Sequence, residues 1–204
     1  MLPQRHGLKE NMFDKTIEKN TIEYGIINGD NRLFFVKVGN GGSIYGRDNR
    51  YLKMAERIHD ARGCSVLVSG DPVEIPIKES IVYDLELIRE IFPDVDNIAA
   101  FGHSKGGQML VSYAYMYPMI KNVLAVNVPL MINLHKTKAG IKNFKGNKIH
   151  MIYGDRDPSF PYAGILDSSL SSRFGYSIVN NADHNFENMT EEFISLPERF
   201  LFQE

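Results

Sequence analysis

The sequence predicts an α/β fold, in which a mostly parallel central sheet carries helices on both faces and begins with an antiparallel hairpin. Strand-like and helix-like segments alternate over most of the chain, which is typical of parallel strands joined by helices. The run Val123–Val126 is apolar throughout, as expected for a strand that is covered on both faces of such a sheet. Near the N-terminus, two strand-like runs flank an Asn-Gly pair, which favours a hairpin.

The N-terminal region is predicted to be a loose polar arm over residues 1–11, followed by two strands. Thr21–Ile27 and Leu33–Val38 are rich in residues that favour strands, and they flank Asn28–Asn31. An Asn-Gly pair between two such runs is a strong hairpin signal, because both residue types accept the left-handed backbone of a tight turn. We therefore expect the hairpin to turn at Asn28 and Gly29.

Helices and strands are then expected in alternation. Apolar residues in Arg47–Ala61 recur at the spacing of one helix face, and Gly63 follows as a stop signal. Ser65–Val68 is apolar but too short for a helix, so it is predicted to be a strand. The same reasoning predicts helices at Glu79–Phe92, Lys105–Tyr117, Leu130–Thr137, Tyr162–Ser172 and from about Thr190, and strands at Asn97–Phe101, Asn122–Val128, Lys148–Tyr153 and Tyr176–Val179.

The composition favours one globular domain. With 204 residues and 43% hydrophobic content, the chain suits a single core, and we assign this domain to residues 12–204. Lys and Arg total 23 against 25 Asp and Glu, so nothing indicates a basic face for nucleic acid or an anionic membrane. A small molecule is the expected binding partner.

Cysteine content and the lack of long apolar runs indicate where the protein acts. Cys64 is the only cysteine, so an intrachain disulfide is excluded, which agrees with a reducing compartment. The first residues lack the apolar core of a signal peptide, and no run approaches the roughly 18 apolar residues of a membrane span. No histidines and carboxylates show metal-ligand spacing. We expect a cytoplasmic protein without a metal or other cofactor, and its oligomeric state stays open.

The segment Gly102-His103-Ser104-Lys105-Gly106 contains the most informative motif, G-x-S-x-G, placed between a predicted strand and a predicted helix. A serine hydroxyl is a weak nucleophile that needs an exposed position beside a base and a helix N-terminus. A sharp strand-to-helix turn supplies that position, and glycines at 102 and 106 remove side chains that would collide there. The backbone N–H of Lys105 is then placed to stabilise a developing oxyanion.

This segment resembles the nucleophile elbow of the α/β-hydrolase superfamily, and the alternation of strands and helices resembles that fold from about residue 12 onward. The resemblance implies a serine hydrolase, with Ser104 as the nucleophile. In that family the acid and the histidine follow the nucleophile in this order, each in a loop after a strand.

The acid is expected in the loop Gly154–Pro158, which resembles the family's G-x-x-D loop. The glycine offset and the following Pro158 favour Asp157, and Asp155 remains the competitor two residues away. The acid would hold the imidazole in the correct tautomer and stabilise its cation.

The base is expected to be His184, in the polar loop after the predicted strand Tyr176–Val179, where the family keeps its histidine. His103 occupies the variable position of the elbow, and we assign it no role in the reaction. The other histidines lie in the arm, a helix, a strand and a connection, and an ordinary structural place is expected for each.

The second oxyanion donor is expected in the glycine-rich loop that begins at Gly39, because the family places it after its third strand. The backbone N–H of Asn40 is the favoured donor, and Gly41 is the alternative. Val38 stands where many family members carry histidine, so this loop departs from the common pattern.

We therefore expect a serine hydrolase that cleaves a small carboxylic ester or thioester through an acyl-enzyme on Ser104. Only Pro129–Asn147 are available for the helical lid that many relatives insert, so a large lid is not expected. A peptidase or an acyltransferase would use the same residues, because fold and residues do not fix the leaving group. A cofactor-free lyase or perhydrolase, or a non-catalytic binding protein on this fold, are further alternatives.

Overall fold

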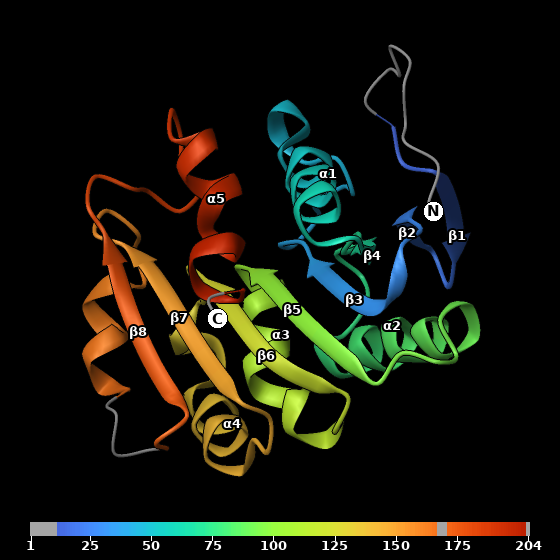
Figure 1. Ribbon diagram of the computed structural model, residues 1–204. Coiled ribbons are helices and arrows are strands. Elements are labelled where there is room, and N and C mark those ends of the chain that lie inside the picture. Colours follow the sequence, from blue (N-terminus) through green and yellow to red (C-terminus); the bar gives the residue numbers. More distant parts are fainter. Residues whose placement is uncertain (1–11, 167–170, 203–204) are drawn as a thin grey trace.

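The computed structural model describes residues 12–166 and 171–202, and the predicted arm over residues 1–11 lies outside them. Eight strands form one sheet in the order β1-β2-β4-β3-β5-β6-β7-β8 (Figure 1). The neighbours from β4 through β8 are parallel, whereas β2 is antiparallel to both β1 and β4. The strands are β1 (Lys15–Lys19), β2 (Ile22–Ile27), β3 (Asp30–Lys37), β4 (Cys64–Ser69), β5 (Asn97–His103), β6 (Ile120–Val126), β7 (Lys148–Gly154) and β8 (Phe174–Val179).

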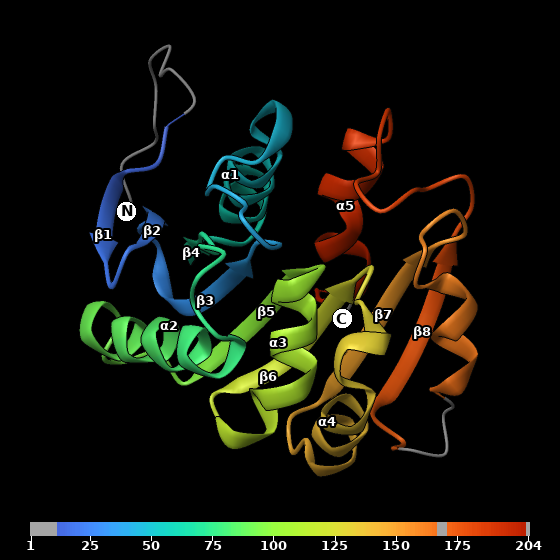
Figure 2. The same ribbon diagram turned by 180° about the vertical axis from the view of Figure 1, so that it is seen from behind.

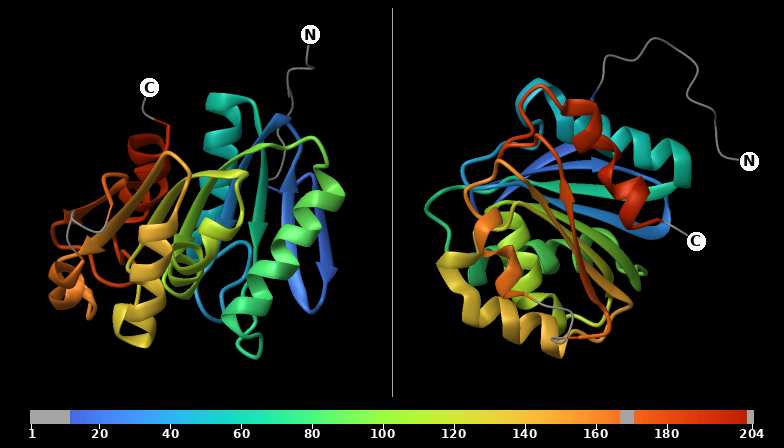
Figure 3. Two further views of the ribbon diagram at one scale, coloured as in Figure 1. Left: turned by 90° about the horizontal axis from the view of Figure 1, so that it is seen from below. Right: turned by 90° about the vertical axis from the view of Figure 1, so that its left-hand side faces the viewer.

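Helices cover both faces of the sheet, as predicted (Figures 2 and 3). One face carries α1 (Arg50–Arg62) and α5 (Thr190–Phe200), and the other carries α2 (Ile77–Ile91), α3 (Lys105–Tyr113) and α4 (Leu130–Asn143). Strand β5 shows why two cores form: Ile98 and Ala100 face the core under α2, α3 and α4, whereas Ala99 and Phe101 face the core under α1 and α5. The central strand is therefore apolar on both faces, which a parallel sheet between two helical layers requires.

The N-terminal hairpin exists, but its predicted position was wrong. It is formed by β1 and β2 and turns at Asn20 and Thr21, which both have left-handed backbone, with φ of 53° and 61°. Strand β4 lies between β2 and β3, so no hairpin forms across Asn28 and Gly29. The glycine serves a close approach instead, because a Cβ atom at Gly29 would lie 2.4 Å from the backbone of Cys64.

Several predicted helices also differ. Helix α3 ends at Tyr113, four residues before the predicted end, and α4 continues to Asn143, six residues beyond the predicted Thr137. The segment predicted as Arg47–Ala61 is divided into a 3-10 turn at Arg47–Asn49 and helix α1, because Asp48 and Asn49 have left-handed backbone. The predicted helix Tyr162–Ser172 is a 3-10 helix over Phe160–Ile165, and residues 167–170 lie outside the described part. Gly164 in this segment disfavours a longer α-helix.

The parallel strands place three chain segments at one edge of the sheet. Ser104 follows β5, Asp157 follows β7 and His184 follows β8, so all three lie beyond the carboxyl ends of parallel strands. Ligands bind at this edge in open α/β sheets. Within residues 12–166 and 171–202, no helix has both the length and the apolar character that crossing a membrane requires.

Candidate active site

Ser104 occupies a sharp turn between β5 and α3. Its backbone has φ 53° and ψ −121°, a conformation that costs a non-glycine residue about 1–3 kcal/mol. The turn is held by two backbone bonds, from Ser104 N–H to the Val126 carbonyl at 2.8 Å and from Gln108 N–H to the Ser104 carbonyl at 2.9 Å. The strain is thus maintained by the sheet on one side and the helix on the other.

The glycines on either side of Ser104 are required by packing, as the sequence predicted. A Cβ atom at Gly106 would lie 2.4 Å from the carbonyl oxygens of Lys37 and Val38, and one at Gly102 would lie 2.6 Å from Gly107 N. These neighbours are backbone atoms, which cannot move aside as a flexible side chain can. Only glycine therefore allows helix α3 to approach β3 and β5 this closely.

The structure brings Ser104, His184 and Asp157 into one hydrogen-bonded chain. His184 Nε2 lies 2.9 Å from Ser104 Oγ, and His184 Nδ1 lies 2.5 Å from Asp157 Oδ2. Asp157 is buried, and its other oxygen accepts from the backbone N–H of Ser159 at 2.6 Å. When the carboxylate accepts from Nδ1–H, the Nε2 lone pair is left facing the serine hydroxyl, which is the tautomer that a general base needs.

Asp155, the competing acid, points elsewhere. Its carboxylate accepts from the backbone N–H of Asn181 at 2.7 Å, on the exposed side of the loop. The geometry therefore favours Asp157 as the partner of His184.

The glycine-rich loop after β3 lies next to Ser104. A Cβ atom at Gly39 would be 3.2 Å from the Ser104 Cβ atom. The N–H of Gly41 donates to the Asp71 carbonyl at 2.7 Å, so this amide is already used. Within the described part of the chain, the backbone N–H groups of Asn40 and Lys105 make no hydrogen bond. These two donors beside Ser104 are therefore available to a ligand.

An open cavity of about 300 Å³ lies over Ser104. It is lined by glycines and by residues with polar or aromatic side chains: Gly39, Asn40, Gly42, Gly46, Arg50, Tyr51, His103, Ser104, His184 and Asn185.

Solved structures share this architecture. Est1E from Butyrivibrio proteoclasticus superposes with a TM-score of 0.74 at 13% identity, over 92% of this chain and 97% of that one. An alpha-beta serine hydrolase homologue from Coxiella burnetii gives 0.72 at 15% identity, over 92% and 97%. The esterase domain of a Rhodothermus marinus protein gives 0.64 at 11% identity, over 92% and 98%.

The chain has the α/β-hydrolase fold. The eight-stranded order and the near-complete coverage of both chains decide this, although no protein-family model and no curated protein matches the sequence. The resemblance read from the elbow motif is thereby confirmed at the level of the fold.

In this α/β-hydrolase fold, the loop that carries His184 is fixed by a buried asparagine that the sequence reading missed. Asn127 follows β6, and its Nδ2 donates to the carbonyls of Asp183 and His184, each at 3.0 Å. Its Oδ1 accepts from the backbone N–H of Gly154 at 2.9 Å. One side chain therefore connects the loop of Asp157 with the loop of His184. In the sequence, Asn127 is marked only by its position at the end of the strand that follows the helix after Ser104.

His103 is a second anchor of that loop, which is a structural role and not a role in the reaction. Burial lowers the pKa of His103 to about 3, so the ring is neutral. Its Nε2 lies 2.8 Å from the His184 carbonyl, and its Nδ1 lies 3.2 Å from the Tyr51 hydroxyl. Because a carbonyl can only accept, Nε2 carries the proton and Nδ1 accepts from Tyr51.

A group of buried and half-buried charged side chains contacts the glycine-rich loop. Lys105 Nζ lies 2.9 Å from Asp71 Oδ2 and donates to Asn40 Oδ1 at 3.2 Å. Deeper in the core, Lys37 Nζ lies 3.2 Å from Asp84 Oδ2 and 3.7 Å from Asp71 Oδ1. Burial raises the pKa of Asp84, since desolvation outweighs the attraction of Lys37. Lys105 thus connects the glycine-rich loop, through Asn40, to a charged network in the core.

Proposed function

We propose that this protein is a serine hydrolase that cleaves small carboxylic esters or thioesters through an acyl-enzyme on Ser104. The observation that carries the proposal is the continuous chain from Ser104 Oγ through His184 to the buried Asp157. A hydrogen-bonded base beside a strained, accessible serine is what activates this nucleophile.

The reaction follows from the geometry in two halves. His184 Nε2 accepts the Ser104 proton while Oγ attacks the carbonyl carbon, and the carbonyl oxygen becomes an oxyanion. The free N–H groups of Asn40 and Lys105 would donate to that oxyanion. His184 then gives its proton to the leaving alcohol or thiol. In the second half, His184 Nε2 takes a proton from water while the water oxygen attacks the acyl carbon. His184 then returns that proton to Ser104 Oγ as the bond from Oγ to the acyl carbon breaks and the carboxylic acid leaves.

The surroundings of the site support a small acyl group. A single helix, α4, joins β6 to β7, and it packs on α3, with Gln108 Nε2 donating to Thr137 Oγ1 at 2.7 Å. Since α4 lies against α3, it leaves the cavity over Ser104 open. One of the similar structures is Est1E with ferulic acid bound, a carboxylic acid, which is the class of product that ester hydrolysis releases.

The test is hydrolysis of p-nitrophenyl acetate, p-nitrophenyl butyrate and a short-chain thioester by the wild type and four variants. Ser104→Ala and His184→Ala are expected to lower kcat by roughly 10³-fold or more, because each removes a group that the reaction needs. Ser195→Ala and His135→Ala are the matched controls, since both residues lie away from the cavity, and both are expected to keep wild-type rates.

Three outcomes would contradict the proposal. Full activity in Ser104→Ala would remove the nucleophile assignment. A well-folded wild type that hydrolyses none of these substrates would favour a binding protein on the hydrolase fold. Rapid hydrolysis of long-chain triglycerides, with activation at the lipid interface, would contradict the small acyl group.

A further inference from the structure

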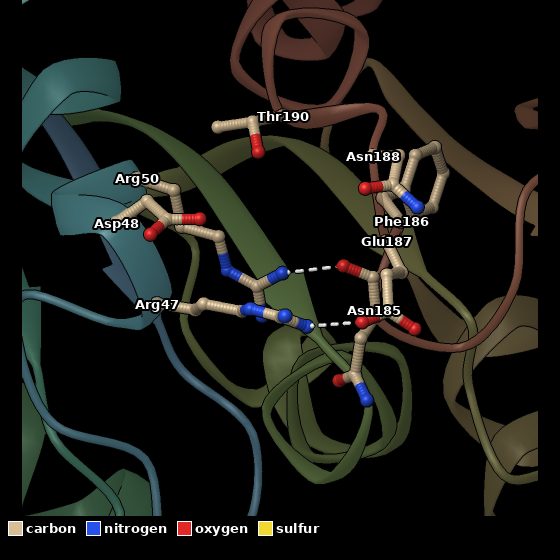
Figure 4. A pocket seen from close by; sticks show the side chains of 8 residues that line it. All are labelled: Arg47, Asp48, Arg50, Asn185, Phe186, Glu187, Asn188 and Thr190. Atoms are coloured by element: carbon tan, nitrogen blue, oxygen red, sulfur yellow. Dashed lines mark hydrogen bonds and ion pairs between the residues drawn. The ribbon is translucent and has the colours of Figure 1, made fainter.

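Arg50 places a buried positive charge at the edge of the cavity over Ser104. It begins helix α1 and is 8% exposed. The residue lines two cavities: the one that contains Ser104, and a neighbouring one of about 120 Å³ that Asn185 also lines. Figure 4 shows the guanidinium groups of Arg47 and Arg50 reaching across to the loop of residues 185–188.

The hydrogen bonds of Arg50 use only part of its capacity. Nη1 donates to the Asn185 carbonyl at 2.7 Å, and Nη2 donates to the Tyr51 hydroxyl at 3.3 Å. A guanidinium has five N–H groups, so three make no hydrogen bond within the described part of the chain, and the buried Nε is one of them. The guanidinium carbon of Arg50 lies over the face of the Phe193 ring, 4.4 Å from the ring centre. No carboxylate in the described part of the chain forms an ion pair with Arg50.

The other cations in and around this region are compensated. Arg47 pairs with Glu187 at 2.9 Å, and Lys37 lies between two buried carboxylates. A buried charge without an opposite charge is destabilising, and contact with ring faces offsets only part of that cost. Arg50 therefore differs from its neighbours in lacking an anion.

The charges that line the two cavities show where an anion would bind. In the smaller cavity, Glu187 and Asp48 oppose Arg47 and Arg50, so the formal charges cancel there. In the cavity over Ser104, Arg50 is the only Arg, Lys, Asp or Glu among the lining residues. A negative group on a bound substrate would meet a cation there and no carboxylate.

We propose that Arg50 binds a carboxylate of the substrate, so that the preferred substrates are monoesters or thioesters of short dicarboxylic acids. This inference rests on the proposed hydrolase function for its chemistry, but the binding of the carboxylate does not depend on catalysis. Arg50 also holds the loop of His184 through the Asn185 carbonyl. Binding of the substrate's free carboxylate would use the remaining N–H groups of Nη1 and Nη2, because Nε is buried.

The first experiment compares kcat/KM for monomethyl succinate and methyl levulinate, measured by pH-stat titration. The two esters have nearly the same shape, and only the first carries a carboxylate. The wild type is expected to prefer monomethyl succinate by at least about 10-fold, the scale of a hydrogen bond to a charged group. Arg50→Met is expected to bring the ratio close to one, whereas Arg50→Lys keeps part of it.

The ratio separates binding from loop positioning. If Arg50 only positions the His184 loop, Arg50→Met lowers both rates equally and the ratio stays the same, which would overturn the proposal. Arg47→Met is the matched control, because Arg47 is already paired with Glu187, and its ratio is expected to equal that of the wild type. A wild type without preference would also overturn the proposal.

A second measurement tests the inference even if no ester is hydrolysed. Succinate is titrated against Ser104→Ala and against Ser104→Ala combined with Arg50→Met, and binding is followed by calorimetry. Binding to the first variant and a loss of at least about 10-fold in affinity in the second support the proposal. Absence of succinate binding to Ser104→Ala contradicts it, whereas ester inactivity alone contradicts only the proposed function.

Discussion

Replacing Lys105 by Met removes an ammonium group that contacts both the buried Asp71 and, at Asn40, the glycine-rich loop. Lys105 Nζ lies 2.9 Å from Asp71 Oδ2, and Asp71 is 1% exposed. Without Lys105, the nearest cation to Asp71 is Lys37, at 3.7 Å. Methionine has a similar length, so the substitution removes the charge and keeps most of the volume.

The substitution is expected to lower the stability because it leaves the buried Asp71 carboxylate with a single cation, Lys37, at 3.7 Å. Removing one partner of a buried ion pair costs about 3–5 kcal/mol. Because the Lys105 side chain is 16% exposed, we expect the lower end, about 3 kcal/mol. For a chain of this size, 1 kcal/mol corresponds to about 2–4 °C, so Tm is expected to fall by roughly 6–12 °C.

The expected effect on the reaction is smaller than the loss of a donor. Removal of one oxyanion donor costs about 10²–10³ in kcat. In Lys105→Met the Asn40 side chain loses its bond, but the loop keeps the bond from Gly41 N–H to the Asp71 carbonyl. We therefore expect kcat on p-nitrophenyl acetate to fall by about 10-fold, with KM nearly unchanged.

Thermal denaturation followed by circular dichroism and steady-state kinetics measure both effects. Lys142→Met is the control, because Lys142 is exposed on α4. Combining Lys105→Met with Asp71→Asn is expected to regain part of the lost Tm, since the uncompensated carboxylate is gone. If Lys105→Met matches Lys142→Met in both Tm and kcat, the reasoning about the network is refuted.

Three further predictions concern packing, loop position and pH. Gly106→Ala is expected to lower both Tm and kcat, because its Cβ would lie 2.4 Å from two carbonyl oxygens, whereas Gly164→Ala, with no atom within 4 Å, should change neither. Asn127→Ala is expected to reduce kcat by about 10²-fold with less effect on KM, because it frees the loops of the acid and the base; equal kcat would contradict this role. Burial lowers the pKa of His150 to about 4. Because the pKa of His150 is higher in the unfolded chain, the unfolded chain binds a proton at higher pH than the folded protein does. The contribution of His150 to the free energy of unfolding is therefore complete above pH 6.5, and it declines by up to about 1.4 kcal/mol per pH unit as the pH falls toward 4. Urea denaturation should show a steeper acid loss in the wild type than in His150→Asn, and equal slopes would contradict the assignment.

The residues that the sequence identified share one property: each follows a strand with a strong pattern. Ser104 lies between an apolar strand and a helix, and Asp157 and His184 come after the strands that end at Gly154 and Val179. Parallel strands direct their carboxyl ends to one edge of the sheet, so order along the chain was sufficient to predict proximity.

The positioning residues could not be identified in this way. Asn127 and His103 act on the His184 carbonyl, 57 and 81 residues along the chain, through bonds from side chain to backbone. Such bonds leave no periodicity and no local motif. The charge of Arg50 becomes informative only once burial and the absence of a carboxylate partner within the described residues are known.

The misplaced hairpin has a similar cause. An Asn-Gly pair signals a turn because glycine accepts left-handed backbone, but glycine is equally required where two backbones approach closely. Gly29 meets the backbone of Cys64, while Asn20 and Thr21 form the turn without any glycine. The sequence alone does not separate these two uses of the residue.

Labelling with a fluorophosphonate tests the central claim, that Ser104 is an activated nucleophile, most directly. The probe reacts with activated serines, and mass spectrometry of the intact and digested protein counts and locates the adduct. We expect one adduct on the peptide that contains Ser104, none in Ser104→Ala, and much slower labelling in His184→Ala. Labelling that persists in Ser104→Ala, or a folded wild type that takes no label, would contradict the account.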